Sequence, residues 1–268
     1  MDFLNIYIFL EFVGIGIAAG ILAGLFGVGG GIIMGPFLIF YLESKGIPQE
    51  ILVQLVFGTV LFVIIFTALT VVWRHHRNGN VIWKAAIPLG IIGILGALTG
   101  STIVAYTPGS ILKRIFGLAL FYVSYQLFRE IKNSEDKNPR YDWIAIIPSG
   151  FAIGVISGLL GVGGGIVGIP LMAIVLHYPY RKIAGTSSAI IVFTGISAVI
   201  GYVFHGWNNA LLPSGSIGYV NITIAIPLLV GTILGSPLGV YIHEKLPTQR
   251  LRQLFALVLI IEGIKLLT

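Results

Sequence analysis

Long apolar stretches, separated by short polar segments, run along the whole chain. Most are about 20 residues long, which is the length that a helix needs to cross the hydrocarbon core of a bilayer. Short alternating strands do not stand out in this pattern, so a membrane β-barrel is not expected. The sequence therefore predicts an all-α polytopic membrane protein. We predict ordinary spans near residues 51–73, 84–105, 112–130, 184–204, 221–242 and 252–267.

Two further apolar regions are interrupted by glycine. The stretch "GLFGVGGGIIMGP" lies within residues 5–42, and "GLLGVGGGIVGIP" lies within residues 144–176. Glycine and proline are poor residues for a helix interior, and the glycines of "GVGGG" do not share one face of a helix. Each region therefore predicts a helix, a break, and a half-helix that starts near Gly31 or Gly165.

The two broken regions are copies of one another. Residues 16–36 align with residues 150–170 at a constant offset of 134, with 12 identities in 21 positions. The motif "AIPL" begins at Ala86 and again at Ala225, and "FGT", which ends at Thr59, parallels "AGT", which ends at Thr186. The chain is therefore predicted to consist of two repeats, residues 1–128 and 144–268, joined by a polar linker over residues 129–143. Each repeat holds one broken region and three ordinary spans.

Loop charges indicate how the broken regions lie in the membrane. If each region folds back as a re-entrant hairpin, twelve Lys and Arg residues fall on one side and four on the other. If each region crossed once, the split would be eight and eight. The positive-inside rule favours the re-entrant arrangement. A hairpin plus three spans gives an odd number of crossings, so we predict two inverted repeats, with the linker 129–143 cytoplasmic and both termini outside the cytoplasm.

Composition supports the same class and excludes others. Hydrophobic residues make up 56% of the 268 residues, charged residues make up 10%, and the mean hydropathy is +0.99, which predicts a multi-pass protein of the cell membrane. The net charge of +6 is spread over short loops, so nucleic acid is not an expected partner. The chain has no cysteine and its five histidines show no ligand spacing, so neither a metal site nor a cofactor is expected.

The breaks are the main candidates for a binding site. Unwound backbone inside a membrane is tolerated only where protein or a watery cavity surrounds it. The half-helix that follows a break begins with N–H groups that have no partner in the helix, and its dipole makes that end positive. Two such ends that face one centre would bind an anion, and hydroxyls near the next spans would add hydrogen bonds. The candidate substrate-binding residues are Gly29, Gly30, Gly31, Thr59, Gly163, Gly164, Gly165, Thr186 and Ser187.

Structural explanations of the same residues stay open. A "GVGGG" cluster also suits a purely structural turn, and Ser and Thr in membrane helices often bond their own backbone. Gly16, Gly20 and Gly24 have the small-xxx-small spacing of closely packed helices. Glu262 lies one turn before Lys265, which favours a surface ion pair over a role in proton coupling.

The paired motifs "GVGGGIIMGP" and "GVGGGIVGIP", each followed by a "GT" segment, resemble the TauE/SafE family of sulfite exporters. The resemblance covers both repeats and hence nearly the whole chain. It implies transport of sulfur-containing anions such as sulfite, sulfonates, sulfoacetate or taurine across a bacterial or archaeal cell membrane. It also implies that the two glycine clusters line the site, with Thr186 and Ser187 in the family's "GTS". The first repeat departs from this pattern, because Val60 stands where a serine is expected.

The leading hypothesis is a secondary transporter, not an enzyme, in which one repeat moves against the other and exposes a small anion to each side in turn. Its expected partners are the anion, the lipid bilayer and H+ or Na+ as the candidate coupling ion, and a homo-oligomer is left open. An anion channel or uniporter is the nearest alternative. An intramembrane serine hydrolase built on Ser187 is a further alternative, although His205 would lie about 27 Å away along the same helix.

Overall fold

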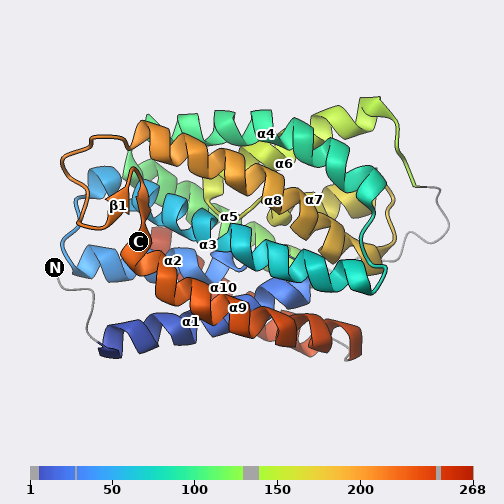
Figure 1. Ribbon diagram of the computed structural model, residues 1–268, viewed down its shortest axis with the longest axis horizontal. Helices are drawn as coiled ribbons and strands as arrows, with labels where there is room; N and C mark the ends of the chain where they lie inside the picture. Colours follow the sequence, from blue (N-terminus) through green and yellow to red (C-terminus); the bar gives the residue numbers. More distant parts are fainter. Residues whose placement is uncertain (1–5, 28, 129–138, 246–248, 268) are drawn as a thin grey trace.

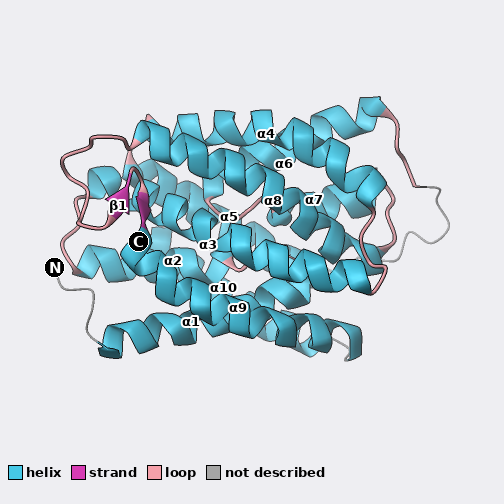
Figure 2. Ribbon diagram, viewed as in Figure 1, coloured by secondary structure: helices cyan, strands magenta, loops and turns pink. Residues whose placement is uncertain are grey.

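The computed structural model describes residues 6–27, 29–128, 139–245 and 249–267. Most of the linker predicted over residues 129–143 lies outside this part. Helices make up almost all of the described chain and run roughly along one common direction as a bundle (Figure 1, Figure 2). The prediction of an all-α polytopic protein is confirmed.

The helices can be grouped by the two predicted repeats. The first repeat contains α1 (Ile6–Phe26), α2 (Gly31–Ser44), α3 (Gln49–Arg77), α4 (Trp83–Ala105) and α5 (Gly109–Phe128). The second contains α6 (Trp143–Leu160), α7 (Gly165–Pro170), the π-helix η1 (Leu171–Val175), α8 (Tyr180–His205), α9 (Ile222–Lys245) and α10 (Gln249–Leu267). The half-helices α2 and α7 begin at the two glycines that the sequence predicted.

Six of the described helices are long and apolar enough to cross a membrane: α1, α3, α4, α6, α8 and α9. Of these six, α3 is the most deeply buried, and it packs against α8 in the middle of the bundle. The spans predicted over 112–130 and 252–267 are α5 and α10, which pack against each other and are not among the six. α5 carries Lys113 and Arg114, which lower its mean hydropathy.

Two local features differ from the prediction. The returning helix of the second repeat changes at Pro170 from α7 into η1, because proline lacks the N–H that a further α-helical hydrogen bond needs and its ring crowds the preceding turn. The loop before α9 forms a short antiparallel hairpin from β1 (Ser216–Ile217) and β2 (Val220–Asn221). The sequence analysis did not predict this hairpin.

Both broken regions fold back on themselves. In the first repeat the ring of Phe12, early in α1, contacts the rings of Phe37 and Tyr41, late in α2, at centroid distances of 6.0 and 5.0 Å. In the second repeat Arg140, just before α6, donates its backbone N–H to the carbonyl of Leu176, just after η1, at 2.9 Å. Each half-helix therefore returns to the end of the bundle at which its region began.

The loops gather at two ends of the bundle. We name the hairpin end for the β1–β2 hairpin, which lies there with the starts of α1 and α3. We name the linker end for residues 139–142, which lie there with the loops 78–82 and 176–179. Figure 1 shows the hairpin end on the left and the linker end on the right.

The two repeats pack against one another reciprocally. α1 packs on α9, and its counterpart α6 packs on α4; α3 and α5 pack on their own counterparts, α8 and α10. The pair α3–α8 is antiparallel. Gly58, early in α3, lies against Tyr202, late in α8, whereas Gly185, early in α8, lies against His75, late in α3. Counterparts that lie antiparallel are what an inverted repeat requires.

Glycines let the helix pairs approach closely. A Cβ added to Gly16, Gly20 or Gly24 of α1 would collide with carbonyl oxygens of α9, and one added to Gly96 or Gly100 of α4 would collide with carbonyl oxygens of α6. The interpretation of the small-xxx-small glycines as packing residues is confirmed. The helices thus form two closely packed pairs, α1–α9 and α4–α6, and each pair contains one helix from each repeat.

Candidate functional site

The two breaks adopt the same backbone conformation. Residues with a Cβ rarely adopt positive φ angles, and both "GVGGG" clusters place glycines at them. The angles are 67°, 90° and 75° at Gly27, Gly29 and Gly30, and 67°, 79° and 73° at Gly161, Gly163 and Gly164. The glycine spacing is therefore a requirement of the turn: its first, third and fourth positions are left-handed, and its fifth begins the half-helix.

The structure brings the two breaks together. A Cβ on Gly31 would lie 3.0 Å from the Cα of Val162, and one on Gly29 would lie 3.1 Å from the carbonyl oxygen of Val162. Gly30 and Gly164 lie against the helices that lead into their breaks, α1 and α6. Gly29, Gly31 and Gly163 thus lie around one buried centre, where the two backbones touch, and the other three predicted glycines, Gly30, Gly164 and Gly165, are buried as well.

Two isoleucines line this centre. Ile64 of α3 and Ile191 of α8 are counterparts in the two repeats, and they are 0% and 1% exposed. A Cβ on Gly29 would lie 3.1 Å from Cγ2 of Ile64 and 3.6 Å from Cδ1 of Ile191, and a Cβ on Gly163 would meet the same two side chains. The sequence reasoning missed both residues. Their equal spacing, at the fifth position after the threonine of each "GT" motif, is the signal that could have found them.

The first turns of the half-helices carry the backbone donors of the centre. In α2 the N–H groups of Ile33 and Met34 bond to the carbonyl of Gly30, and in α7 the N–H of Gly168 bonds to the carbonyl of Gly164. N–H groups earlier in each first turn precede every acceptor of their own helix. Both first turns are largely buried, so solvent screens the positive helix ends only weakly.

The hydroxyls of Thr59 and Thr186 have a different role from the predicted one. Thr59 Oγ1 accepts the backbone N–H of Asn221 at 2.9 Å, and Thr186 Oγ1 accepts that of Ile82 at 3.0 Å. Thr186 also donates to the carbonyl of Lys182 at 2.7 Å. The two counterparts therefore fasten the chain just before α9 and α4. In this structure neither hydroxyl is directed at the breaks.

Ser187 is the hydroxyl that reaches a break. Its Oγ donates to the carbonyl oxygen of Gly27 at 3.1 Å, and its side chain is buried. Its counterpart in the first repeat is Val60, which has no hydroxyl to offer. The departure of the first repeat from the "GTS" pattern therefore makes the two breaks chemically unequal.

Each break is closed off toward one end of the bundle by a helix of the other repeat. The first glycine of break one, Gly27, lies against the backbone of Ala184 in α8, and we call this the linker-end contact. The first glycine of break two, Gly161, lies against Phe57 in α3, and we call this the hairpin-end contact. In this structure both contacts are closed.

Two pockets lead from the hairpin end along α2. One, of about 600 Å³, is lined by Lys113, Arg114 and Lys265 together with two glutamates, and Lys113 Nζ lies 2.8 Å from Oε1 of Glu43. The second, of about 610 Å³, shares Phe40 and Lys265 with the first and reaches Ile32, next to the break. Charged side chains thus line the first pocket, and mostly apolar side chains line the second.

The ion pair predicted between Glu262 and Lys265 is present, with Lys265 Nζ at 3.3 Å from Oε1 of Glu262. It lies beside the second pocket. The interpretation of these two residues as an ion pair is confirmed.

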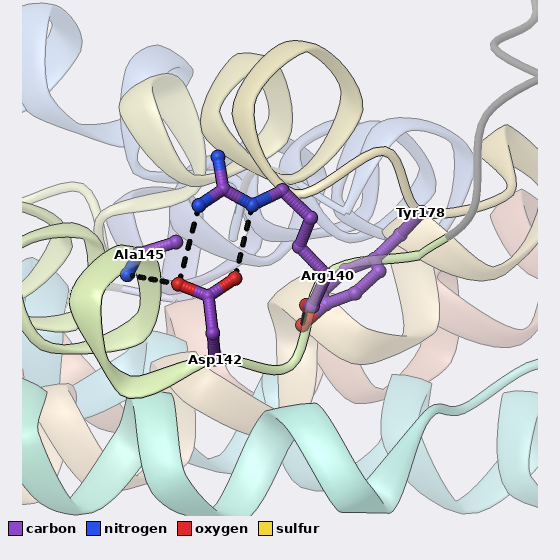
Figure 3. Close-up of polar contacts among 4 residues, drawn as sticks. All are labelled: Arg140, Asp142, Ala145 and Tyr178. Atoms are coloured by element: carbon purple, nitrogen blue, oxygen red, sulfur yellow. Dashed lines mark hydrogen bonds and ion pairs between the residues drawn. The ribbon is translucent and has the colours of Figure 1, made fainter.

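A polar cluster at the linker end holds together the two arms of the second broken region, α6 and α7–η1 (Figure 3). Arg140 binds the carboxylate of Asp142 through Nε at 3.0 Å and Nη2 at 3.2 Å, and the same carboxylate caps α6 by accepting the N–H of Ala145 at 3.0 Å. The Tyr178 hydroxyl donates to the carbonyl of Arg140 at 2.9 Å. The Arg140 guanidinium holds the pKa of Asp142 below its ordinary value, and burial raises the pKa of Tyr178. The cluster ties the end of η1 to the start of α6.

Comparisons with known proteins bear on what such a centre does. The model of the family described as Sulfite exporter TauE/SafE matches residues 12–266. A probable membrane transporter protein of Methanocaldococcus jannaschii is 33% identical over 259 residues, which cover 94% of this chain and 93% of that protein. Probable membrane transporter proteins of Haemophilus influenzae and Bacillus subtilis are each 28% identical, over 94% and 97% of this chain and 95% and 97% of their own lengths. No solved structure matches the chain.

Proposed function

The chain belongs to the TauE/SafE family of membrane transporters, and from this premise we propose that it is a secondary transporter for a small sulfur-containing anion. Sulfite, a sulfonate, sulfoacetate and a taurine-like molecule are the substrates in question. The anion binds at the centre between the two breaks. The half-helix starts at Gly31 and Gly165 supply backbone N–H groups and positive helix ends, and Ile64 and Ile191 supply an apolar wall.

One observation carries this proposal: two breaks with the same left-handed glycine conformation meet in the interior between antiparallel counterparts, α3 and α8. Left-handed backbone interrupts a helix and leaves N–H groups without helical partners. Such an interruption is tolerated in a membrane where it is buried in protein or lines a cavity. Its burial supports a role in binding more than a role in surface turn formation.

We propose that the two closed contacts act as the gates of alternating access. An anion at the centre leaves toward the linker end when Gly27 separates from Ala184, and toward the hairpin end when Gly161 separates from Phe57. We infer that the moving bodies are the helix pairs α1–α9 and α4–α6, because their glycine-mediated packing is too close to slide without collision. This differs from the hypothesis in which one repeat moves against the other.

We further infer that the two repeats are inverted in the membrane and that the linker end faces the cytoplasm of the cell. The antiparallel pair α3–α8 supports the inversion. The loops at the linker end carry basic residues such as Arg77, Arg140 and Arg181, which supports the cytoplasmic assignment under the positive-inside rule.

The test is transport by purified protein in proteoliposomes. Radiolabelled sulfite and taurine and a labelled sulfonate are offered in turn, with empty liposomes as the control. We expect saturable uptake of at least one of them and competition by the others. The absence of saturable flux for every small anion would contradict the proposal.

Counterflow separates a transporter from the alternative of a channel or uniporter. Liposomes preloaded with unlabelled substrate accumulate label transiently if the protein is an alternating-access carrier. Both contacts around the centre are closed in this structure, which favours the carrier. Stepwise single-channel currents would favour the channel instead.

A serine hydrolase finds less support. The Ser187 hydroxyl donates its proton to a backbone carbonyl, which is not a base, and His205 bonds to the carbonyl of Gly201 in its own helix. Activation of a serine needs a base at its hydroxyl.

A further inference from the structure

The two ends of the bundle are built alike but differ in chemistry. At the hairpin end Gly58 of α3 lies against Tyr202, and at the linker end Gly185 of α8 lies against His75. The register that aligns Thr59 of α3 with Thr186 of α8 also aligns His75 with Tyr202. His75 therefore occupies at one end the position that Tyr202 occupies at the other.

Two more positions differ in the same sense. His243 of α9 has Val104 of α4 as its counterpart, and Ser187 has Val60. The linker end thus holds two imidazoles and a hydroxyl where the hairpin end holds a phenol and two valines. Of these groups only an imidazole ordinarily changes its charge between about pH 5 and pH 8. At these three positions the two ends therefore differ in their capacity to bind a proton.

The two imidazoles form a pair. The His75 side chain is 0% exposed, and its ring meets the ring of His243 edge to face at a centroid distance of 5.6 Å. His243 Nδ1 lies 2.7 Å from the carbonyl oxygen of Leu25. A carbonyl only accepts hydrogen bonds, so Nδ1 carries a hydrogen and an added proton binds at Nε2. Two rings this close accept one such charge far more readily than two, because like charges repel.

The pair is attached to the first break. Leu25 lies in the last turn of α1, two residues before Gly27, whose carbonyl accepts the Ser187 hydroxyl in the linker-end contact. A positive charge on His243 would face the C-terminal end of α1, where the helix dipole is negative. A proton on the pair therefore strengthens the interaction between His243 and the end of α1, which forms one side of the linker-end contact.

The surroundings supply mostly positive charge. Among the described side chains, the ionisable residues on the elements that pack around the pair are Arg74, His76 and Arg77 of α3, Arg181 and Lys182 of α8, Lys84 of α4 and Tyr241 of α9; in α1 the acid Glu11 lies at the opposite end. A negative charge at the adjacent break favours a positive charge on the imidazoles, so the proton and the anion each favour the binding of the other.

From this arrangement we propose that His75 and His243 form a proton-binding site coupled to the anion site, so that one proton binds together with one anion at the linker end. This inference rests on the proposed transport function and names the residues that would carry its coupling ion. Because the His75–His243 pair lies at the linker end, its proton acts on the linker-end contact and leaves the hairpin-end contact unaffected.

The first measurement uses the wild-type protein. Sulfoacetate binding is measured by calorimetry, since the charge of this anion does not change between about pH 6 and pH 8, in buffers with different enthalpies of ionisation. We expect uptake of up to one proton per anion bound. We also expect affinity at least about fivefold higher at pH 6 than at pH 8. Binding without linked proton uptake would overturn the proposal, whether or not any variant folds.

The second measurement assigns the proton. His75→Gln and His243→Gln should abolish most of the pH dependence of sulfoacetate binding. His205→Gln is the matched control, because His205 Nδ1 also lies near a backbone carbonyl, that of Gly201 at 2.8 Å, but at the hairpin end. The control should keep the pH dependence of the wild type.

The outcomes separate this proposal from the transport function. Unchanged pH dependence in His75→Gln and His243→Gln, or its loss in His205→Gln, would overturn the histidine assignment while binding and flux persist. Absence of binding and flux for sulfite, taurine and sulfoacetate alike would count against the transport function itself.

Discussion

Gly30 and Gly46 adopt nearly the same left-handed conformation, with φ angles of 75° and 76°, in very different surroundings. A Cβ on Gly30 would lie 2.7 Å from the carbonyl oxygen of Ala19, whereas a Cβ on Gly46 would meet nothing within 4 Å. A comparison of the two glycines therefore distinguishes two effects: the left-handed conformation, which both positions need, and the close approach of two backbones, which occurs only at the break.

We expect Gly30→Ala to abolish anion transport and to lower thermal stability markedly. Both Gly30→Ala and Gly46→Ala force an alanine into the left-handed region, at a cost of about 1–2 kcal/mol, but only the first also pushes the break away from α1. Flux assays and melting temperatures in detergent check this. Equal loss of transport in both variants would mean that the break has no special role.

The apolar wall of the centre makes a second prediction at this scale. Ile64→Ala removes a side chain that is 0% exposed and lies beside Gly29 and Gly31. We expect destabilisation of about 2–5 kcal/mol and a higher rate for bulky sulfonates relative to sulfite, because the centre becomes wider. Ile91→Ala, at a position that is 54% exposed, is the control and should leave the substrate preference unchanged. An unchanged preference in Ile64→Ala would place the anion elsewhere.

At the scale of elements, the sequence predicted the helices better than it predicted the contacts between them. Glycine spacing located the starts of α2 and α7, because the left-handed turn demands those residues. Hydropathy cannot show that Ile64 and Ile191 lie beside the same glycines, since this depends on how α3 crosses α8. It also cannot show that Thr59 and Thr186 bond to distant loops, because a hydroxyl in a helix has several partners within reach.

The two threonines should act on stability and not on substrate affinity. Thr59→Val and Thr186→Val each leave a backbone N–H before α9 or α4 without its acceptor, which costs about 1–3 kcal/mol. Thr99→Val is the control, because the Thr99 hydroxyl is exposed and bonds to Leu95 in its own helix. We expect lower melting temperatures with unchanged KM for the first two. A raised KM with normal stability would instead support the original prediction that the two threonines bind substrate.

The cap of α6 gives a pH-dependent prediction. Because Arg140 lowers the pKa of Asp142 in the folded state, the carboxylate stabilises the fold above its unfolded-state pKa, and this contribution is lost as the pH falls through the folded-state value. Asp142→Ala should therefore melt below the wild type at pH 7, and the difference should shrink below about pH 4.

Arg140→Gln separates the ion pair from the cap in the same experiment. This variant keeps the Asp142 side chain that accepts the N–H of Ala145, so it should lose less stability at pH 7 than Asp142→Ala. A constant difference between Asp142→Ala and the wild type across the pH range would show that the charge of the cap is irrelevant.

At the scale of the whole molecule, the arrangement of the loops can be tested directly because the chain has no cysteine. Single cysteines at the exposed positions Asn78, at the linker end, and Ser44, at the hairpin end, report the side of the membrane. In intact cells a membrane-impermeant thiol reagent should label Ser44→Cys and should spare Asn78→Cys until the membrane is opened. Labelling of both from the same side would refute the proposed orientation.

The exchange of partners between the repeats has a consequence for the history of the fold. The first helix of each repeat packs on a helix of the other, so a half-length chain would leave its own α1 surface uncovered. It could cover that surface only by pairing with a second copy that had inserted upside down. If the two repeats are inverted as proposed, a half-sized form of this fold would have to enter the membrane in both orientations, and fusion of two copies removes that requirement.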